Sequence, residues 1–147
     1  MFKDSIFILL AILSGVIISI YLPMNSVISR YIGSPIAANI AFFLGALITS
    51  VTIFVIFGDI NSIRNITQVP PYLFITGIAG ALMVLLATIL IPKLGARKMF
   101  VLLLSGQVIM AIIISHFGLL ESPKDPITIK KIIGAGILIV GAIISLV

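Results

Sequence analysis

Long apolar runs separated by short polar segments dominate this sequence. Five runs are long enough to form helices that cross a bilayer, which takes roughly 20 residues. They cover residues 5–22, 35–57, 71–91, 99–120 and 127–147. The pattern predicts an all-α polytopic membrane protein, with one five-helix transmembrane domain over residues 1–147.

Local signals place the ends of these runs. Ser34 followed by Pro35 is typical of a helix N-cap and first turn, so we expect the second helix to begin there. Pro23 to Asn25 is expected to break the first helix. Because Asp4 spoils the basic start of a signal peptide and further spans follow, we interpret the first run as a span.

The composition agrees with lipid as the solvent. Of 147 residues, 61% are hydrophobic and only 9% are charged, against about 25% in a soluble domain. This excludes a soluble enzyme, a nucleic-acid-binding protein and a disordered linker, and makes the bilayer the first partner. The sequence has no cysteine and one histidine, so we expect no disulfide, no metal site and no cofactor.

Basic residues are almost equally divided between the two sides of the membrane. The opposite side from the N-terminus holds Arg30, Lys93, Arg97 and Lys98, and the N-terminal side holds Lys3, Arg64, Lys124, Lys130 and Lys131. Five against four gives almost no positive-inside bias, so the sequence permits insertion in both orientations. A fixed orientation with a weak signal is the alternative.

Small residues recur at helical spacing within several of the runs. Such ladders allow close approach of helix backbones in lipid, so we predict that they serve helix packing. Their members are Ala11, Gly15, Ser19, Ala37, Ala41, Gly45, Gly77 and Ala81.

Charged and catalytic groups are missing from the middle of the spans. A charge there usually marks a proton or ion path, so an acid-coupled pump of the usual kind is disfavoured. Ser105 and His116 lie on one predicted helix, about 16 Å apart along its axis, too far for a nucleophile and its base. We therefore expect no enzymatic activity.

Uncharged polar residues form the candidate substrate site. Ser14, Tyr21 and Asn25 share one face of the first helix next to Pro23, and a broken helix beside polar groups often marks a transporter site. The full set of candidates is Ser14, Tyr21, Asn25, Arg30, Asn39, Gln107 and His116. Each can instead form hydrogen bonds that hold helices together, and Arg30 and His116 can be residues of the membrane interface.

Three stretches carry a family resemblance. Residues 22–46 read LPMNSVISRYIGSPIAANIAFFLGA; later come GIAGAL, PKLGA and SGQVIMAIIISHFGL, and the C-terminal part reads KKIIGAGILIVGAIISL. Together they resemble the small YdcZ-like integral membrane proteins of the drug/metabolite transporter superfamily, over essentially the whole chain. Ser115 stands where that family often has an acidic residue, so no role of that acid is carried over.

The resemblance implies a five-helix unit equivalent to half of a ten-helix transporter. We therefore hypothesise a protomer in a bacterial inner membrane that moves a small metabolite as an antiparallel homodimer or beside a paired homologue. A membrane scaffold or regulatory subunit is the alternative. The substrate stays open, although Arg30 and the basic turn would suit an anion or a zwitterion.

Overall fold

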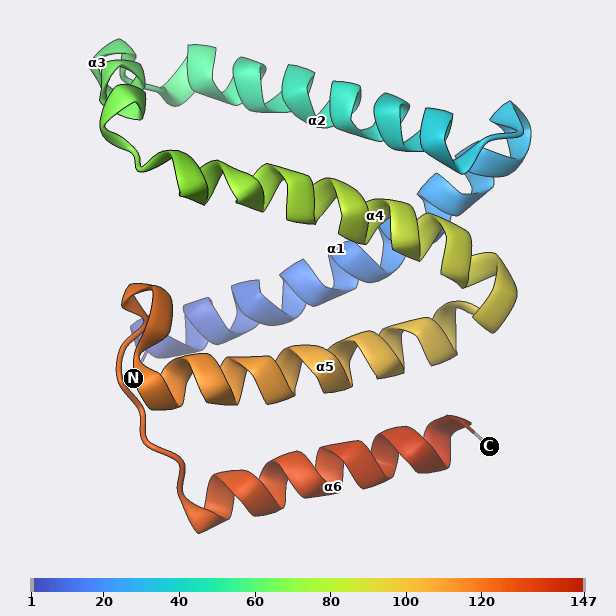
Figure 1. The fold of residues 1–147 in the computed structure, drawn as a ribbon, viewed down its shortest axis with the longest axis vertical. Helices are drawn as coiled ribbons and strands as arrows, with labels where there is room; N and C mark the ends of the chain where they lie inside the picture. The colour runs from blue at the N-terminus through green and yellow to red at the C-terminus, as the bar shows by residue number, and fades with distance from the viewer. Residues whose placement is uncertain (1, 147) are drawn as a thin grey trace. The chain divides into compact units, whose positions relative to one another are not determined.

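The computed structural model describes the backbone of residues 2–146 and the side chains of residues 5–146. In chain order its elements are α1 (Phe2–Ile32), α2 (Pro35–Phe57), α3 (Ile60–Arg64), η1 (Asn65–Gln68), η2 (Pro71–Phe74), α4 (Ile75–Leu94), α5 (Ala96–Phe117), η3 (Leu119–Glu121) and α6 (Ile129–Leu146) (Figure 1). No β-strand occurs between residues 2 and 146. The all-α prediction is confirmed.

Five helical segments are long and apolar enough to cross a membrane. They are Ser5–Ile32, Pro35–Phe57, Pro71–Leu94, Ala96–Phe117 and Ile129–Leu146. Large apolar side chains such as Phe7 and Ile48 are 68% and 67% exposed along them, as expected for helices that face lipid. Five membrane-spanning helices are what the sequence predicted.

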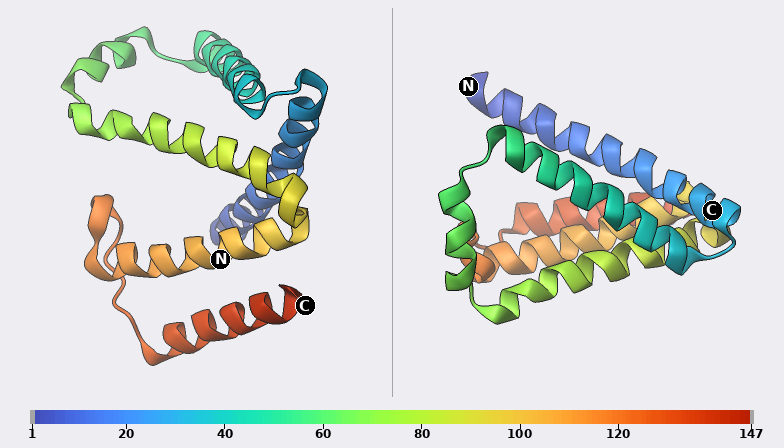
Figure 2. Two further views of the ribbon diagram at one scale, coloured as in Figure 1. Left: turned by 45° about the vertical axis from the view of Figure 1, so that its right-hand side comes forward. Right: turned by 90° about the horizontal axis from the view of Figure 1, so that it is seen from above.

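The contacts divide the chain into two compact units, Met1–Lys93 and Leu94–Val147. The first holds α1 to α4 and the second holds α5, η3 and α6 (Figure 2). The predicted single five-helix domain therefore stays a prediction, and each unit is described by itself below.

The first helix differs from the sequence prediction at its C-terminal end. It continues through Pro23 to Ile32 and ends at Gly33, whose φ of 79° lies in the left-handed region. The N–H of Gly33 donates to the carbonyl of Ser29 at 2.9 Å, which is a glycine helix stop. A proline inside a helix removes one backbone donor without breaking the fold where neighbours hold the helix. Gly33, and not Pro23, ends this span.

Other boundaries shift by a few residues. Ser34 caps α2 by accepting from the N–H of Ala37 at 3.3 Å, and Pro35 is its first residue, as predicted. The fourth span begins at Ala96 and ends before Gly118 (φ 63°), so it lies three residues earlier than the predicted 99–120. The fifth begins at Ile129. The predicted linker 58–69 is largely helical, as α3 and η1.

Some sequence-based predictions fall outside the part of the chain that is described. The side chains of Lys3 and Asp4 and the end of the last span at Val147 belong there. The charge count over the two sides therefore remains a statement about the sequence.

The core of the first unit lies where the end of α1, the start of α2 and the end of α4 meet. Leu22, Ala38 and Ala87 are 0% exposed there. By contrast, Gly15 and Gly45, near the middle of α1 and α2, have open space where a Cβ would stand. The packed end is the one that carries the buried polar residues.

Candidate functional site: the polar junction of α1, α2 and α4

Four polar side chains are buried in this junction. Asn25, Ser26 and Ser29 come from α1 and Thr88 comes from α4, and their exposed fractions are 1%, 3%, 8% and 1%. A buried polar group without partners costs free energy, and lipid offers none. We call these four residues, together with Asn39 of α2, the polar junction.

Thr88 connects α4 to α1. Its hydroxyl donates to the carbonyl of Val84 at 2.8 Å and accepts from Nδ2 of Asn25 at 2.8 Å. The hydroxyl has a single proton, so the bond to Val84 leaves it only as an acceptor for Asn25. One side chain therefore fixes the position of the Asn25 amide.

The backbone of Thr88 makes a second link to α1. Pro92 lies four residues later inside α4 and has no N–H, so the carbonyl of Thr88 lacks its helical donor. The hydroxyl of Ser26 lies 3.2 Å from that carbonyl, closer than the carbonyl of Leu22 in its own helix at 3.4 Å. The proline thus creates an acceptor, and α1 supplies the donor.

Asn39 connects α2 to α4. Its Nδ2 donates to the carbonyl of Ala81 at 3.3 Å, seven residues before Thr88. Seven residues are two helical turns, so the two contacts lie on one face of α4, about 10 Å apart along its axis. The amides of Asn25 and Asn39 therefore hold three helices together.

The carbonyl oxygens of both amides have no partner within the described part of the chain. Oδ1 of Asn25 and Oδ1 of Asn39 are covered by protein atoms and accept no hydrogen bond from the described residues. An unmet buried acceptor costs about 1–3 kcal/mol, so such atoms call for an explanation.

Aromatic and apolar side chains line the surroundings. Tyr21, one turn before Asn25, stacks on Phe42 of α2 with ring centroids 5.4 Å apart. Beside Asn39, an apolar groove of about 360 Å³ runs between α2 and α4. Its lining is Asn39, Ile40, Phe43, Leu44, Leu47 and Ala81. The junction is thus uncharged, with amide groups next to apolar space.

Two other candidates of the first unit lie away from the junction. Ser14 is exposed and its hydroxyl donates to the carbonyl of Leu10 at 2.9 Å within α1. Arg30 is also exposed, and with Val27 and Tyr31 it lines a shallow hollow at the end of α1. The structure therefore brings Tyr21, Asn25 and Asn39 together and leaves Ser14 and Arg30 outside.

The remaining candidates belong to the second unit. Gln107 lies exposed in the middle of α5, and His116 lies near its end. Nδ1 of His116 accepts from the N–H of Ile127 at 3.0 Å, and the N–H of Asp125 donates to the carbonyl of Ser115 at 2.8 Å. These two bonds hold the connection between α5 and α6 against the end of α5.

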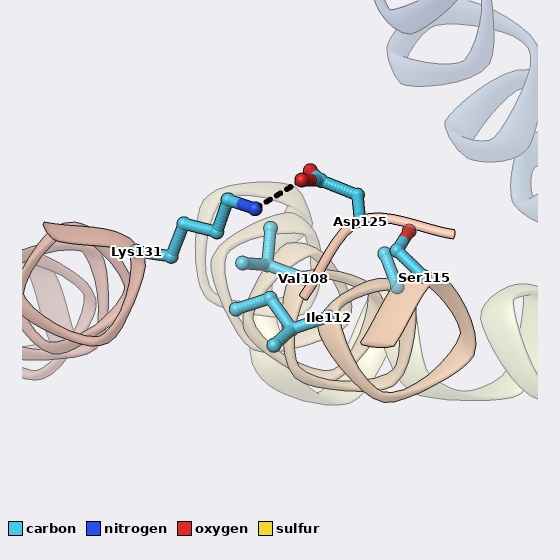
Figure 3. Close-up of a pocket in the computed structure, with 6 residues that line it drawn as sticks. Val108, Ile112, Ser115, Asp125 and Lys131 are labelled. Atoms are coloured by element: carbon cyan, nitrogen blue, oxygen red, sulfur yellow. Dashed lines mark hydrogen bonds and ion pairs between the residues drawn. The ribbon is translucent and has the colours of Figure 1, made fainter. Parts of the chain in front are cut away.

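A small pocket lies beside this connection. Figure 3 shows Val108, Ile112 and Ser115 of α5 below an ion pair between Asp125 and Lys131. The pocket measures about 190 Å³, and Lys131 also donates to the carbonyl of Pro126 at 2.8 Å. Asp125 and Lys131 already pair with one another, so the pocket offers a ligand mainly apolar surface.

Sequence reasoning did not identify Ser26 and Thr88. The available signal was Pro92 four residues after Thr88, because a proline inside an apolar run frees the carbonyl four residues earlier. The hydroxyl that donates to that carbonyl belongs to Ser26, 62 residues away in sequence, so the pattern could not identify it.

The small-residue ladders remain a prediction. Ala37 and Ala81 are half-buried, but a Cβ added at Gly15, Gly45 or Gly77 would meet nothing within 4 Å in the described part of the chain. The exposed positions Ala11, Ser19 and Ala41 extend these faces. Within one chain, most of the ladder surface is open.

The arrangement suits hydrogen bonding and not acid–base chemistry. The described residues include no group of three His, Cys, Asp or Glu side chains that could hold a metal ion. The polar junction consists of amides and hydroxyls, which bind and orient a solute without exchanging protons with it.

Comparison with known proteins gives one match that spans nearly the whole chain. Residues 6–144 match the family described as "Putative inner membrane exporter, YdcZ". The chain belongs to the YdcZ family. No curated protein and no solved structure matches it. With five helices able to span a bilayer, the family description supports a multi-pass transporter of an inner membrane.

Proposed function

We propose that this YdcZ-family chain is one half of a drug/metabolite-type exporter in a bacterial inner membrane. Two copies, or one copy and a homologue, pair in opposite orientations. The pair moves a small metabolite by alternating access, and the proposed binding residues at the polar junction are Tyr21, Asn25 and Asn39. Ser14, Arg30, Gln107 and His116 complete the set of candidates that the sequence predicts.

The observation that carries the proposal is the unpaired Oδ1 of Asn25. This side chain is 1% exposed, yet its oxygen accepts no hydrogen bond from the described residues. Polar groups inside membrane spans are expensive and are typical of substrate pathways. In a chain of an exporter family, a solute that supplies the missing donor accounts for this cost.

The helix count and the charge distribution support pairing in opposite orientations. Five spans place the two ends of the described chain on opposite sides of the membrane. Nine basic residues divide five to four between the sides, which favours neither orientation. Inverted repeats that rock around a site near the midplane are the usual architecture of secondary transporters. The open ladders with Gly15, Gly45 and Gly77 offer faces on which a second copy can pack.

Flux through proteoliposomes tests the transport function. The purified chain is reconstituted, and efflux of a labelled metabolite panel is compared with that of the Asn25→Ala and Gln107→Leu variants. Asn61→Ala, which removes an exposed amide in α3, is the matched control. We expect at least tenfold slower flux for Asn25→Ala and unchanged flux for the control. Full flux in both site variants would overturn the proposed pocket.

A scaffold or regulatory subunit is the second candidate. The observation in its favour is that Asn25 and Asn39 each donate to α4, as amides that only join helices do. In that case the wild-type chain would carry no flux, and Asn25→Ala would lower stability alone. Measuring flux and thermal stability on the same preparations separates the two candidates.

A further inference from the structure

We infer that the polar junction receives an uncharged solute with hydroxyl or primary amide groups, held by Oδ1 of Asn25 and Oδ1 of Asn39. The inference rests on the proposed transport function and narrows its substrate class. Both oxygens are covered in this structure, so the solute reaches them when α1 and α2 move apart from α4.

The direction of each amide follows from its partner. The carbonyl of Ala81 can only accept, so Asn39 must turn its nitrogen toward it. With the Thr88 proton donated to Val84, Asn25 likewise turns its nitrogen toward the Thr88 hydroxyl oxygen. Flipping the Asn39 amide would bring two acceptors face to face at 3.3 Å, and flipping the Asn25 amide would do the same at 2.8 Å as long as Thr88 donates its proton to Val84. The two oxygens are therefore the groups left for a guest.

The hydrogen-bonding groups that the two amides leave unpaired determine which class of solute fits. Each oxygen needs a donor, and each Nδ2 has one further N–H beyond the bond that it makes. Hydroxyl and primary amide groups both donate and accept, so they match this pair of groups. A carboxylate or a fully ionised phosphate group supplies acceptors only, and a quaternary ammonium ion supplies no donor. Both would leave the two oxygens unpaired.

The charge around the junction points the same way. Between Ser5 and Ser29, throughout α2, and in α4 before Lys93, the sequence has no charged residue. A buried ion without a counter-charge is strongly unfavourable. Arg30 is exposed at the end of α1 and outside the junction. An uncharged solute therefore fits better than the anion or zwitterion that Arg30 suggested from the sequence.

The spacing of the two amides indicates a solute with several polar groups. Their contacts on α4 are about 10 Å apart along the helix axis. The groove of about 360 Å³ next to Asn39 is within the lower range of small-molecule sites. Its apolar wall, with Phe43 and Leu47, can cover the carbon skeleton of an elongated polyol.

Tyrosine fluorescence offers a direct binding test. The sequence has no tryptophan and three tyrosines, so Tyr31→Phe with Tyr72→Phe leaves Tyr21 as the one fluorophore, one turn from Asn25. Three probes are titrated into the purified protein: xylitol, triethylene glycol dimethyl ether and tetramethylammonium chloride. The ether is uncharged but has acceptors only. We expect a saturable change with xylitol and none with the other two.

Variants link the signal to the two oxygens. Asn25→Leu and Asn39→Leu should each weaken xylitol binding about tenfold, while Asn61→Leu, in exposed α3, should leave it unchanged. If Asn25→Leu fails to fold, the half-buried Asn39 decides the question. Equal binding of the ether or the ammonium ion, no saturable response to xylitol, or unchanged affinity in the Asn25 and Asn39 variants would overturn the inference.

The outcomes also separate this inference from the proposed function. Xylitol binding that depends on both amides, without flux of any solute in proteoliposomes, supports the ligand class and contradicts transport. Flux of charged solutes without xylitol binding supports transport and contradicts the ligand class.

Discussion

Thr88 shows how one residue can determine the geometry of a membrane-embedded site. Its hydroxyl serves both Val84 and Asn25, and its carbonyl accepts from Ser26. In water, each of these bonds would compete with solvent. In lipid no such competitor exists, so loss of the hydroxyl leaves the buried Nδ2 of Asn25 without its partner.

We predict that Thr88→Val lowers the free energy of unfolding by about 1–3 kcal/mol, the cost of an unsatisfied buried polar group. Valine keeps the shape and removes the hydroxyl. Thr49→Val is the matched control, because Thr49 makes the same bond to a carbonyl four residues earlier, at 2.9 Å, but is exposed. Unfolding in detergent micelles, followed by circular dichroism, measures both. Equal losses for Thr88→Val and Thr49→Val would contradict the role of the junction.

The sequence predicted part of this residue-scale arrangement. Asn25 and Asn39 stand out because strong polar groups are rare in apolar runs. Thr88 does not stand out, because a threonine in a membrane helix can satisfy its hydroxyl within its own helix. Its partner Asn25 lies 63 residues away, and such pairings depend on tertiary packing. Whether the predicted set of residues binds substrate remains a prediction.

At the scale of helices, the hydropathy pattern predicted the effect of proline on helix ends least well. Pro23 was expected to end the first helix, yet α1 continues for nine more residues to Ile32. Pro92 likewise lies inside α4. Long apolar runs predicted the existence of all five spans, because lipid requires helices of a minimum length. Their ends depend on local backbone bonds, such as the one at Gly33, which hydropathy does not report.

The pairing of Ser26 with the carbonyl freed by Pro92 predicts a specific coupling. Ser26→Ala should cost about 1 kcal/mol in the wild-type background, because the carbonyl of Thr88 then loses its donor. In a Pro92→Ala background the helix supplies its own N–H, so Ser26→Ala should cost almost nothing. A double-mutant cycle on unfolding free energies measures this coupling. Additive effects of the two substitutions would show that Ser26 does not replace the missing donor.

His116 has a testable structural role at the end of α5. Its Nδ1 accepts from the N–H of Ile127, so His116→Phe should expose that amide and speed its hydrogen exchange about fivefold. His116→Asn offers a side-chain oxygen as acceptor and should restore part of the protection. Ser105→Ala, on the same helix, removes only a bond to the carbonyl of Val101 and is the control. Unchanged exchange at Ile127 in His116→Phe would refute this role.

For the whole molecule, the central claim is that two copies work together in opposite orientations. The support is an odd number of spans, a basic-residue count of five against four, and ladder faces that one chain leaves open. Length and hydropathy predicted the number of spans. Oligomeric state could not be derived the same way, because open helix faces pack equally well against lipid or a second protein.

Site-directed labelling tests this claim most directly. Because the sequence has no native cysteine, an introduced cysteine is the one residue that the reagent labels. Two variants are each expressed singly and treated with a membrane-impermeant maleimide. They are Tyr31→Cys, at the end of the first span where the tyrosine is 89% exposed, and Ser62→Cys, between α2 and α4. Adding Asn65→Lys raises the number of basic residues on the N-terminal side to six, against four on the other side. This substitution should bias the orientation and serves as the positive control. The account predicts that, without this added charge, each cysteine labels from both sides of the membrane. Strict labelling of each cysteine from one side would contradict the inverted homodimer and require a separate partner.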